Sequence, residues 1–256
     1  MNGKSTLAPV SGSAGLPEVL AAGPEAILVR FALRAEPAAM AAAQALAARL
    51  TTAPPAGVRE IVPALVSVQI GFDSAVSDRA TLAQELLARA RAIVSVPAVL
   101  PEPARRWIIP AAFGGQDGPQ LEETAALAGL SARAAVEAIC DADLRILAIG
   151  FAPGQPYIGL LPEEWDLPRM QALNPAVPAG AVVVAVRQIV MFGAQSATGW
   201  RQVARAAFRS FVPGRESPMP LRAGDAIRYA TAPADEIARL AETPDGLGGA
   251  RLEILR

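Results

Sequence analysis

The sequence predicts an α+β protein of two domains, a small layered domain followed by a larger domain built from short strands. Three observations support this class. Helix and strand patterns alternate up to about residue 96, a proline-rich stretch follows, and short apolar runs separated by glycine and proline fill the remainder. With 256 residues, the chain is long enough for each domain to bury a core of its own.

Residues 23–96 are expected to form the α+β domain, after a flexible lead-in at residues 1–22 that is rich in Gly, Ser, Ala and Pro. Val66, Val68 and Ile70 alternate with polar residues, which indicates a strand, whereas leucines in the second helix follow helical spacing. The predicted elements are a strand at 26–33, a helix at 37–50, strands at 57–62 and 65–72, and a helix at 79–91. This order is typical of a ferredoxin-like sandwich, and we expect a later strand, starting near residues 93–96, to close it.

Residues 97–105 are the predicted linker, because this stretch is rich in proline. Residues 106–256 form the predicted second domain, in which Ser131 is placed to cap a helix. Its expected strands are 106–113, 144–149, 181–186, 189–192, 199–204, 208–212, 226–230 and 251–255, and its expected helices are 119–128, 131–140 and 235–242. Many short strands with frequent turns predict a closed or nearly closed barrel.

The segment Gly150–Gly159 is the most informative part of the chain. It contains two prolines, three glycines and two aromatic residues, directly after the apolar run 144–149. Proline lacks an N–H donor and glycine adopts backbone angles closed to other residues, so we expect a rigid loop and neither a helix nor a central strand. Loops of this kind often carry binding sites, although an unusual structural turn is the alternative interpretation.

Absences in the composition exclude several kinds of site. The chain has no histidine, one cysteine and a single lysine, Lys4. Ser-His-Asp and Cys-His catalytic sites, a zinc site of His and Cys, and an internal disulfide are therefore excluded. No lysine is left in the folded body to carry biotin, and Gly3–Thr6 lies too near the start to complete a phosphate-binding loop. Any chemistry must use Asp, Glu, Ser, Thr, Tyr, Arg, backbone dipoles or another chain.

Charge and hydropathy limit the partners. The net charge of −1 gives no electrostatic footprint for nucleic acid, and no apolar run approaches the roughly 18 residues of a membrane helix. The first residues lack the basic and apolar regions of a signal peptide. We therefore expect a cytoplasmic protein with no nucleic-acid or membrane partner and no metal.

An ordered set of motifs is more specific than any of its members. The motifs are Ile109–Leu121 (IPAAFGGQDGPQL), Gly129–Ser131, Gly150–Gly159, Val177–Gly180 (VPAG), Gly199–Trp200 and Leu221–Asp225 (LRAGD). Together, over about residues 26–229, they resemble a carboxyltransferase-domain family. This family comprises the B subunit of 5-oxoprolinase and the first subunit of allophanate hydrolase, and it includes an inhibitor of a sporulation histidine kinase.

The resemblance implies a fold, a partner and an activity. The fold is an N-terminal α+β domain followed by a cyclophilin-like β-barrel. The partner is a C-type protein, similar to the second subunit of allophanate hydrolase. With a further subunit, the complex uses ATP to open 5-oxoproline to glutamate. Fused relatives transfer a carboxyl group from carboxybiotin to urea. A regulatory protein-binding module and a non-catalytic subunit remain alternatives, and prolyl isomerase activity would rest on fold analogy alone.

The sequence departs from the family pattern at the expected site. Gln155 replaces an aromatic residue, while Ile139 and Arg205 stand where the family usually has histidines. Proton transfer near neutral pH is lost with those histidines, so the chain either acts on a different substrate or serves a structural role.

Eight residues are the candidate substrate-binding set, and no catalytic residue is assigned. Gln155 and Tyr157 offer an amide and a hydroxyl to a small amide or carboxylate, and the Arg205 guanidinium suits a carboxylate. Structural alternatives are that Phe151 anchors its loop, that Gln188 is a core amide and that Arg205 is a surface charge. The full set is Phe151, Pro153, Gly154, Gln155, Pro156, Tyr157, Gln188 and Arg205. Asp117 follows the family's glycine-rich loop pattern only loosely, and it could just as well accept hydrogen bonds from the amides of its own turn.

Overall fold

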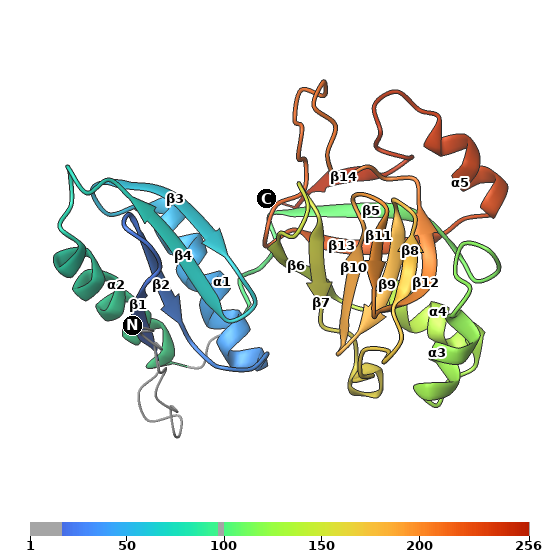
Figure 1. Cartoon of the computed structure of the whole chain (residues 1–256), viewed down its shortest axis with the longest axis horizontal. Helices are drawn as coiled ribbons and strands as arrows, with labels where there is room; N and C mark the ends of the chain where they lie inside the picture. The colour runs from blue at the N-terminus through green and yellow to red at the C-terminus, as the bar shows by residue number, and fades with distance from the viewer. Residues whose placement is uncertain (1–16, 97–99, 256) are drawn as a thin grey trace, which may run out of the picture. The chain divides into compact units, whose positions relative to one another are not determined.

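The structure is a computed structural model that describes residues 17–96 and 100–255. Most of the predicted lead-in, the Gly3–Thr6 segment and linker residues 97–99 lie outside the described residues. Internal contacts divide the chain into two compact units, Met1–Leu100 and Pro101–Arg256. The predicted class, a layered α+β unit followed by a β-barrel, is confirmed (Figure 1).

The first unit is a four-stranded antiparallel sheet with strand order β1-β2-β4-β3, packed against two helices (Figure 1). Alternate residues of the central strands point into the core, as Ile27 and Val29 do in β2. Leu46 of α1 and Leu86 of α2 meet them from the helices. The elements are β1 (Glu18–Ala21), β2 (Ala26–Arg30), α1 (Pro37–Thr52), β3 (Val58–Pro63), β4 (Ser67–Phe72) and α2 (Arg79–Val94).

The edge strand that pairs with β2 is β1, which precedes β2 in sequence, so the expectation of a later closing strand is wrong. Residues 18–21, which the sequence places in the lead-in, form β1 and pair with β2. Gly23 takes a positive φ of 112° in the short turn between them, and local hairpin pairing closes only a small loop. Ile93 instead continues α2 and is buried in the same core as Leu86, which lies about two helical turns earlier.

The second unit is a closed barrel of seven strands in the ring order β5-β12-β9-β10-β7-β6-β13, with β14 added to β5 (Figure 1). Strand β5 closes the ring because it runs parallel to β13 on one side, while its final residues pair with β12 on the other. The ring strands are β5 (Arg105–Phe113), β6 (Leu144–Ile149), β7 (Pro156–Gly159), β9 (Ala181–Ala185), β10 (Gln188–Met191), β12 (Arg201–Ala206) and β13 (Ala226–Thr231).

Side chains fill the barrel interior. Ile109, Ile146 and Ile158, from three different strands, are fully buried in one continuous apolar cluster. The predicted barrel is therefore confirmed as a packed core, with binding surfaces left to its ends and loops. The remaining elements are α3 (Leu121–Leu127), α4 (Ala132–Asp141), a 3₁₀ turn (Glu163–Trp165), β8 (Asn174–Val177), β11 (Ser196–Thr198), α5 (Ala234–Ala241) and β14 (Arg251–Ile254). Ser131 caps α4 as predicted, since its hydroxyl accepts the Ala134 N–H at 3.2 Å.

Two sequence predictions for this unit need correction. The Gly150–Gly159 segment is a loop only as far as Gln155; its last four residues form β7, which lies between β6 and β10. Pro156 is tolerated there because it occupies the first position of the strand. Residues 208–212 form no strand, because the chain leaves the barrel after β12 and Phe208 turns inward to pack edge-on against Trp107 at 5.6 Å.

No helix in residues 17–96 or 100–255 is both long enough and apolar enough to cross a membrane.

Candidate functional site

Two of the hollows in the described part of the barrel unit share no lining residue. We call the larger, of about 800 Å³, the motif cleft, and the smaller, of about 280 Å³, the aromatic hollow. The motif cleft is lined by residues 112–117, 179–180, 205–209, 232–234, 237–238 and 241. The aromatic hollow is lined by Phe151, Gln155, Tyr157, Arg169, Leu173, Val190, Phe192 and residues 197–200.

The motif cleft forms where β5 and β12 lie side by side. Residues 114–117, which follow β5, and residues 179–180, which precede β9, contribute to its lining there. Glycines in the sequence motifs make this approach possible. A Cβ at Gly118 would lie 1.9 Å from the Val203 carbonyl oxygen, and one at Gly180 would lie 2.0 Å from that of Ala206. These glycines therefore let the motif turns contact the β12 backbone directly, which no larger residue permits.

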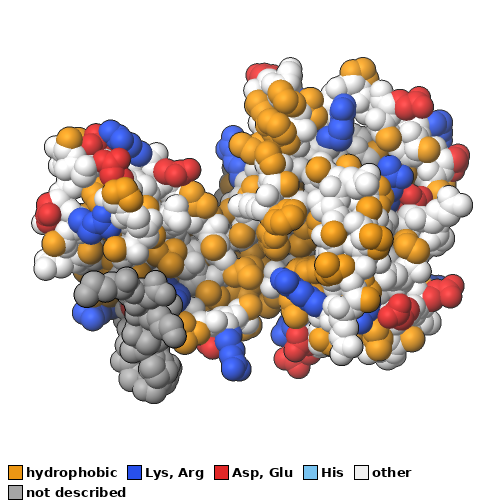
Figure 2. Space-filling view, in the orientation of Figure 1, with side chains coloured by type: hydrophobic (Ala, Val, Ile, Leu, Met, Phe, Trp, Pro, Cys, Tyr) orange, Lys and Arg blue, Asp and Glu red, His pale blue; other side chains and the backbone are white. Residues whose placement is uncertain are grey.

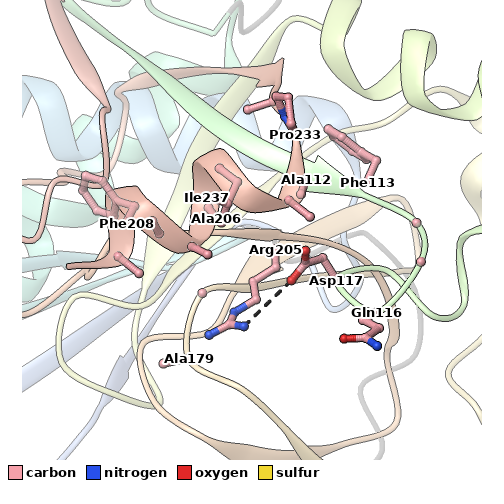
Figure 3. A pocket seen from close by; sticks show the side chains of 18 of the residues that line it. Ala112, Phe113, Gln116, Asp117, Ala179, Arg205, Ala206, Phe208, Pro233 and Ile237 are labelled. Atoms are coloured by element: carbon pink, nitrogen blue, oxygen red, sulfur yellow. Dashed lines mark ion pairs between the residues drawn. The ribbon is translucent and has the colours of Figure 1, made fainter. Parts of the chain in front are cut away.

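Arg205 and Asp117 face each other across the motif cleft (Figure 3). The guanidinium and carboxylate are 3.8 Å apart, with the Arg205 side chain 43% exposed and the Asp117 side chain 16% exposed. Among the described residues this is the one interaction of the Asp117 carboxylate, since only its backbone oxygen is otherwise bonded, by Gln202. The carboxylate does not satisfy turn amides, so one structural interpretation of Asp117 is wrong. Both groups keep hydrogen-bonding capacity that faces the cleft.

The aromatic hollow lies beside the loop that precedes β7. The Tyr157 and Trp200 rings meet edge to face, with centroids 6.5 Å apart. The Gln155 side chain is only 1% exposed, and its Oε1 accepts the Gly193 N–H at 3.3 Å. The Arg169 guanidinium lies over the Trp200 ring, 5.4 Å from its centroid. The hollow thus combines apolar walls, a buried amide and a cation.

Close backbone contacts fix the loop itself. Gly154 has a φ of 69°, and a Cβ at this position would lie 2.3 Å from the Ser210 carbonyl oxygen. The Ser210 hydroxyl donates to the Pro153 carbonyl at 3.3 Å. Phe151 also has a positive φ and is 76% exposed, so it does not anchor the loop in the barrel.

The chain matches a known protein family over most of its length. The family model for "Carboxyltransferase domain, subdomain C and D" matches residues 17–221. The chain belongs to this carboxyltransferase-domain family. Ile109–Leu121 and Val177–Gly180, two of the motifs on which the resemblance rested, border the motif cleft, while Gly150–Gly159 and Gly199–Trp200 border the aromatic hollow.

Curated relatives in the family are named as the B subunit of 5-oxoprolinase. The protein of Escherichia coli O157:H7 is 36% identical over 129 residues, which is 50% of this chain and 59% of that protein. The protein of Bacillus subtilis (strain 168) is 31% identical over 121 residues, or 47% of this chain and 50% of that protein. The matches therefore span little more than half the length of these relatives.

Solved structures share the fold. A crystal structure of TTHA0988 matches with a TM-score of 0.65 and 30% identity, over 82% of this chain and 40% of that chain. The Kluyveromyces lactis urea amidolyase structure matches with a TM-score of 0.68 over 92% of this chain and 16% of that chain. Its 16% identity means that this second likeness concerns the fold alone.

The candidate residues from the sequence do not form one site in this family member. Phe151, Gln155 and Tyr157 line the aromatic hollow, whereas Arg205 lines the motif cleft. Gln188 is buried in β10 and borders neither hollow. The other candidates shape the backbone: Pro153, Gly154 and Pro156.

Nothing in the sequence identifies Arg169 as a site residue, and the sequence alone does not decide the role of Asp117. Arg169 follows a 3₁₀ turn and reaches Trp200 only through tertiary folding, so no local pattern identifies it. Two other arginines of the barrel unit, Arg187 and Arg201, are structural. Arg187 Nε donates to the Leu161 carbonyl at 2.9 Å, and Arg201 Nη1 donates to the Pro168 carbonyl at 2.7 Å.

Groups with clearly shifted pKa values lie away from both hollows. Burial raises the pKa of the Cys140 thiol to about 11, and the Asp141 charge adds to the effect. Burial also raises the pKa values of Tyr229 and Asp225. Asp225 accepts hydrogen bonds from Arg105 at 2.7 Å and Trp107 at 3.2 Å, which makes it a structural group beneath the barrel wall. Among the described residues, no group of three or more acidic or cysteine side chains is placed to hold a metal ion.

Proposed function

We propose that this chain is a subunit of an ATP-dependent complex that opens a small cyclic amide, 5-oxoproline, to glutamate, or transfers a carboxyl group, together with a C-type partner subunit. Family membership and the names of the curated relatives support the proposal. The observation that carries it is the Arg205–Asp117 pair in a cleft bordered by family motifs.

The pair is complementary to a cyclic amide. Such an amide presents its carbonyl oxygen and its N–H on the same side of the C–N bond. Arg205 can donate to that oxygen while Asp117 accepts from the N–H, and each contact uses capacity that the protein leaves unused. An exposed ion pair is worth only about 0–1 kcal/mol, so a ligand can separate it at small cost.

The same contacts suit the reaction. Ring opening adds the hydroxyl group of water to the carbonyl carbon and breaks the C–N bond. The remaining proton of that water ends on the nitrogen. Negative charge grows on the carbonyl oxygen meanwhile, and an arginine placed against it stabilises this charge. Asp117, beside the nitrogen, orients the N–H and can hold a proton.

The motif cleft does not suit a triphosphate. The Asp117 carboxylate faces the space in which phosphate oxygens would lie, and no lysine lies in the described part of the chain. ATP would supply the free energy for the reaction, and we propose that other parts of the complex bind it. The residues of this chain then bind and orient the amide.

A partner subunit would cover apolar surface that the barrel unit exposes. Ile254 is 66% exposed, Met219 50% and Leu252 42%. Figure 2 shows hydrophobic side chains spread over the visible face of this unit. Large exposed apolar side chains of this kind are typical of protein–protein interfaces.

The test is co-expression with a C-type subunit, followed by assays on 5-oxoproline and on urea-derived amides. Arg205→Gln and Asp117→Asn should each lower kcat/KM by about 10–100-fold, the effect of losing one charge-assisted hydrogen bond. Arg133→Gln is the matched control, because Arg133 is 88% exposed and pairs only with Glu137. A confirmed complex that turns over none of these amides, or one that tolerates both cleft substitutions, would refute the proposal.

A further inference from the structure

We propose that the aromatic hollow is a second binding site, separate from the motif cleft, for a small aromatic monocarboxylate that carries a further oxygen acceptor. Three features define the ligand, and none of them depends on the proposed function: a buried amide, aromatic walls and an unpaired guanidinium. The hollow has no lining residue in common with the motif cleft, so the two sites can be tested independently.

The amide of Gln155 supplies a donor with no partner. This side chain is 1% exposed, and its Oε1 already accepts from the Gly193 N–H. Its Nε2 has no acceptor among the described residues, although it belongs to a residue that lines the hollow. Among the described residues, Nε2 is not one of the fully enclosed side-chain atoms left without a partner, so it reaches the open space of the hollow and can donate to an acceptor oxygen on a ligand.

The walls suit a single flat ring. Tyr157 and Trp200 stand edge to face, and Phe192 and Val190 add buried apolar surface. The volume of about 280 Å³ lies just below the lower end of the range of roughly 300–1,000 Å³ that is usual for small-molecule sites. A ligand of one ring with small substituents therefore fits, whereas a nucleotide would not.

The guanidinium of Arg169 sets the charge of the ligand. It stacks on Trp200 and makes no ion pair or hydrogen bond with any described residue. None of the residues that line the hollow is acidic, so the site is electropositive. A guanidinium fork matches both carboxylates and phosphates, and the smaller carboxylate is the one that fits beside a ring in about 280 Å³.

The probes are 4-hydroxybenzoate and two analogues that each lack one of its groups. Benzoate lacks the ring hydroxyl that would accept from Gln155, and 4-hydroxybenzamide lacks the negative charge of the carboxylate. Isothermal titration calorimetry on the full chain should show 4-hydroxybenzoate binding about tenfold tighter than either analogue, since each contact is worth about one decade in Kd. Trp200 fluorescence should change on binding, because its ring forms a wall of the hollow.

Two substitutions assign the contacts. Arg169→Gln should abolish the preference for 4-hydroxybenzoate over 4-hydroxybenzamide, and Gln155→Met should abolish the preference over benzoate. Arg133→Gln, at an exposed position outside both hollows, is the control and should leave all three affinities unchanged. Arg169 is exposed, so its variant gives a result even if Gln155→Met fails to fold. Equal affinities for the three probes, or preferences that both substitutions leave intact, would overturn the proposal.

Discussion

Gly154→Ala should destabilise the barrel unit far more than a comparable glycine substitution elsewhere. Gly154 has a φ of 69°, and a Cβ there would lie 2.3 Å from the Ser210 carbonyl oxygen. Gly129 is the matched control, because its φ is 72° and a Cβ there would meet nothing within 4 Å. The two alanines therefore carry the same backbone strain, and only one of them also collides with another segment.

The magnitude follows from these two terms. The left-handed conformation costs a non-glycine residue about 1–2 kcal/mol, which applies to both variants. Forcing a methyl group into filled space adds about 1–3 kcal/mol for Gly154→Ala alone. We expect a loss of about 1–2 kcal/mol for Gly129→Ala and of about 2–5 kcal/mol for Gly154→Ala.

Tryptophan fluorescence during urea unfolding is the appropriate assay. The three tryptophans, Trp107, Trp165 and Trp200, all lie in the barrel unit, so the signal reports this unit without a contribution from the first. Equal losses in the two variants would show that the loop yields freely to the methyl group. Such a result would mean that the Ser210 segment does not hold the loop in place.

Two further predictions concern buried groups. Folding raises the pKa of the Cys140 thiol from 9.0 to about 11, so the contribution of this thiol to stability is complete below pH 9 and is lost as the pH rises through 11. Cys140→Ala should therefore flatten the alkaline decline in the free energy of unfolding measured by urea titration. An unchanged decline would mean that Cys140 is not the group responsible. Asp225→Ala should cost about 3–5 kcal/mol in the same assay, because it leaves Arg105 as a largely buried charge without its partner. A loss below about 1 kcal/mol would mean that water replaces the carboxylate.

The elements that the sequence predicts well are those with a strong local pattern. Leu82 and Leu86 lie one helical turn apart and are both buried, and the apolar run of β6 is buried as expected. These patterns are decided within a few residues, so periodicity is enough to find them. The motif glycines likewise indicate turns, and Gly180 indeed lies in one.

The predictions that fail depend on contacts between distant segments. β1 and β7 contain few strand-forming signals, and each becomes a strand because a neighbour supplies its hydrogen bonds. The candidate site is divided for the same reason. Whether Gln155 and Arg205 share a pocket depends on where the barrel strands place them, and neither residue carries that information locally.

The strand that closes the barrel also determines when this unit can fold. β5 is the first strand of its unit in sequence, yet its partners are β12, β13 and β14, the earliest of which begins only at Arg201. On the ribosome, a nascent chain emerges from its N-terminus, so β5 must wait unpaired until β12, β13 and β14 have been made. The first unit has all its strands within residues 18–72 and can fold long before then. A chaperone that shields exposed β-edges should therefore raise the yield of the barrel and leave that of the first unit unchanged.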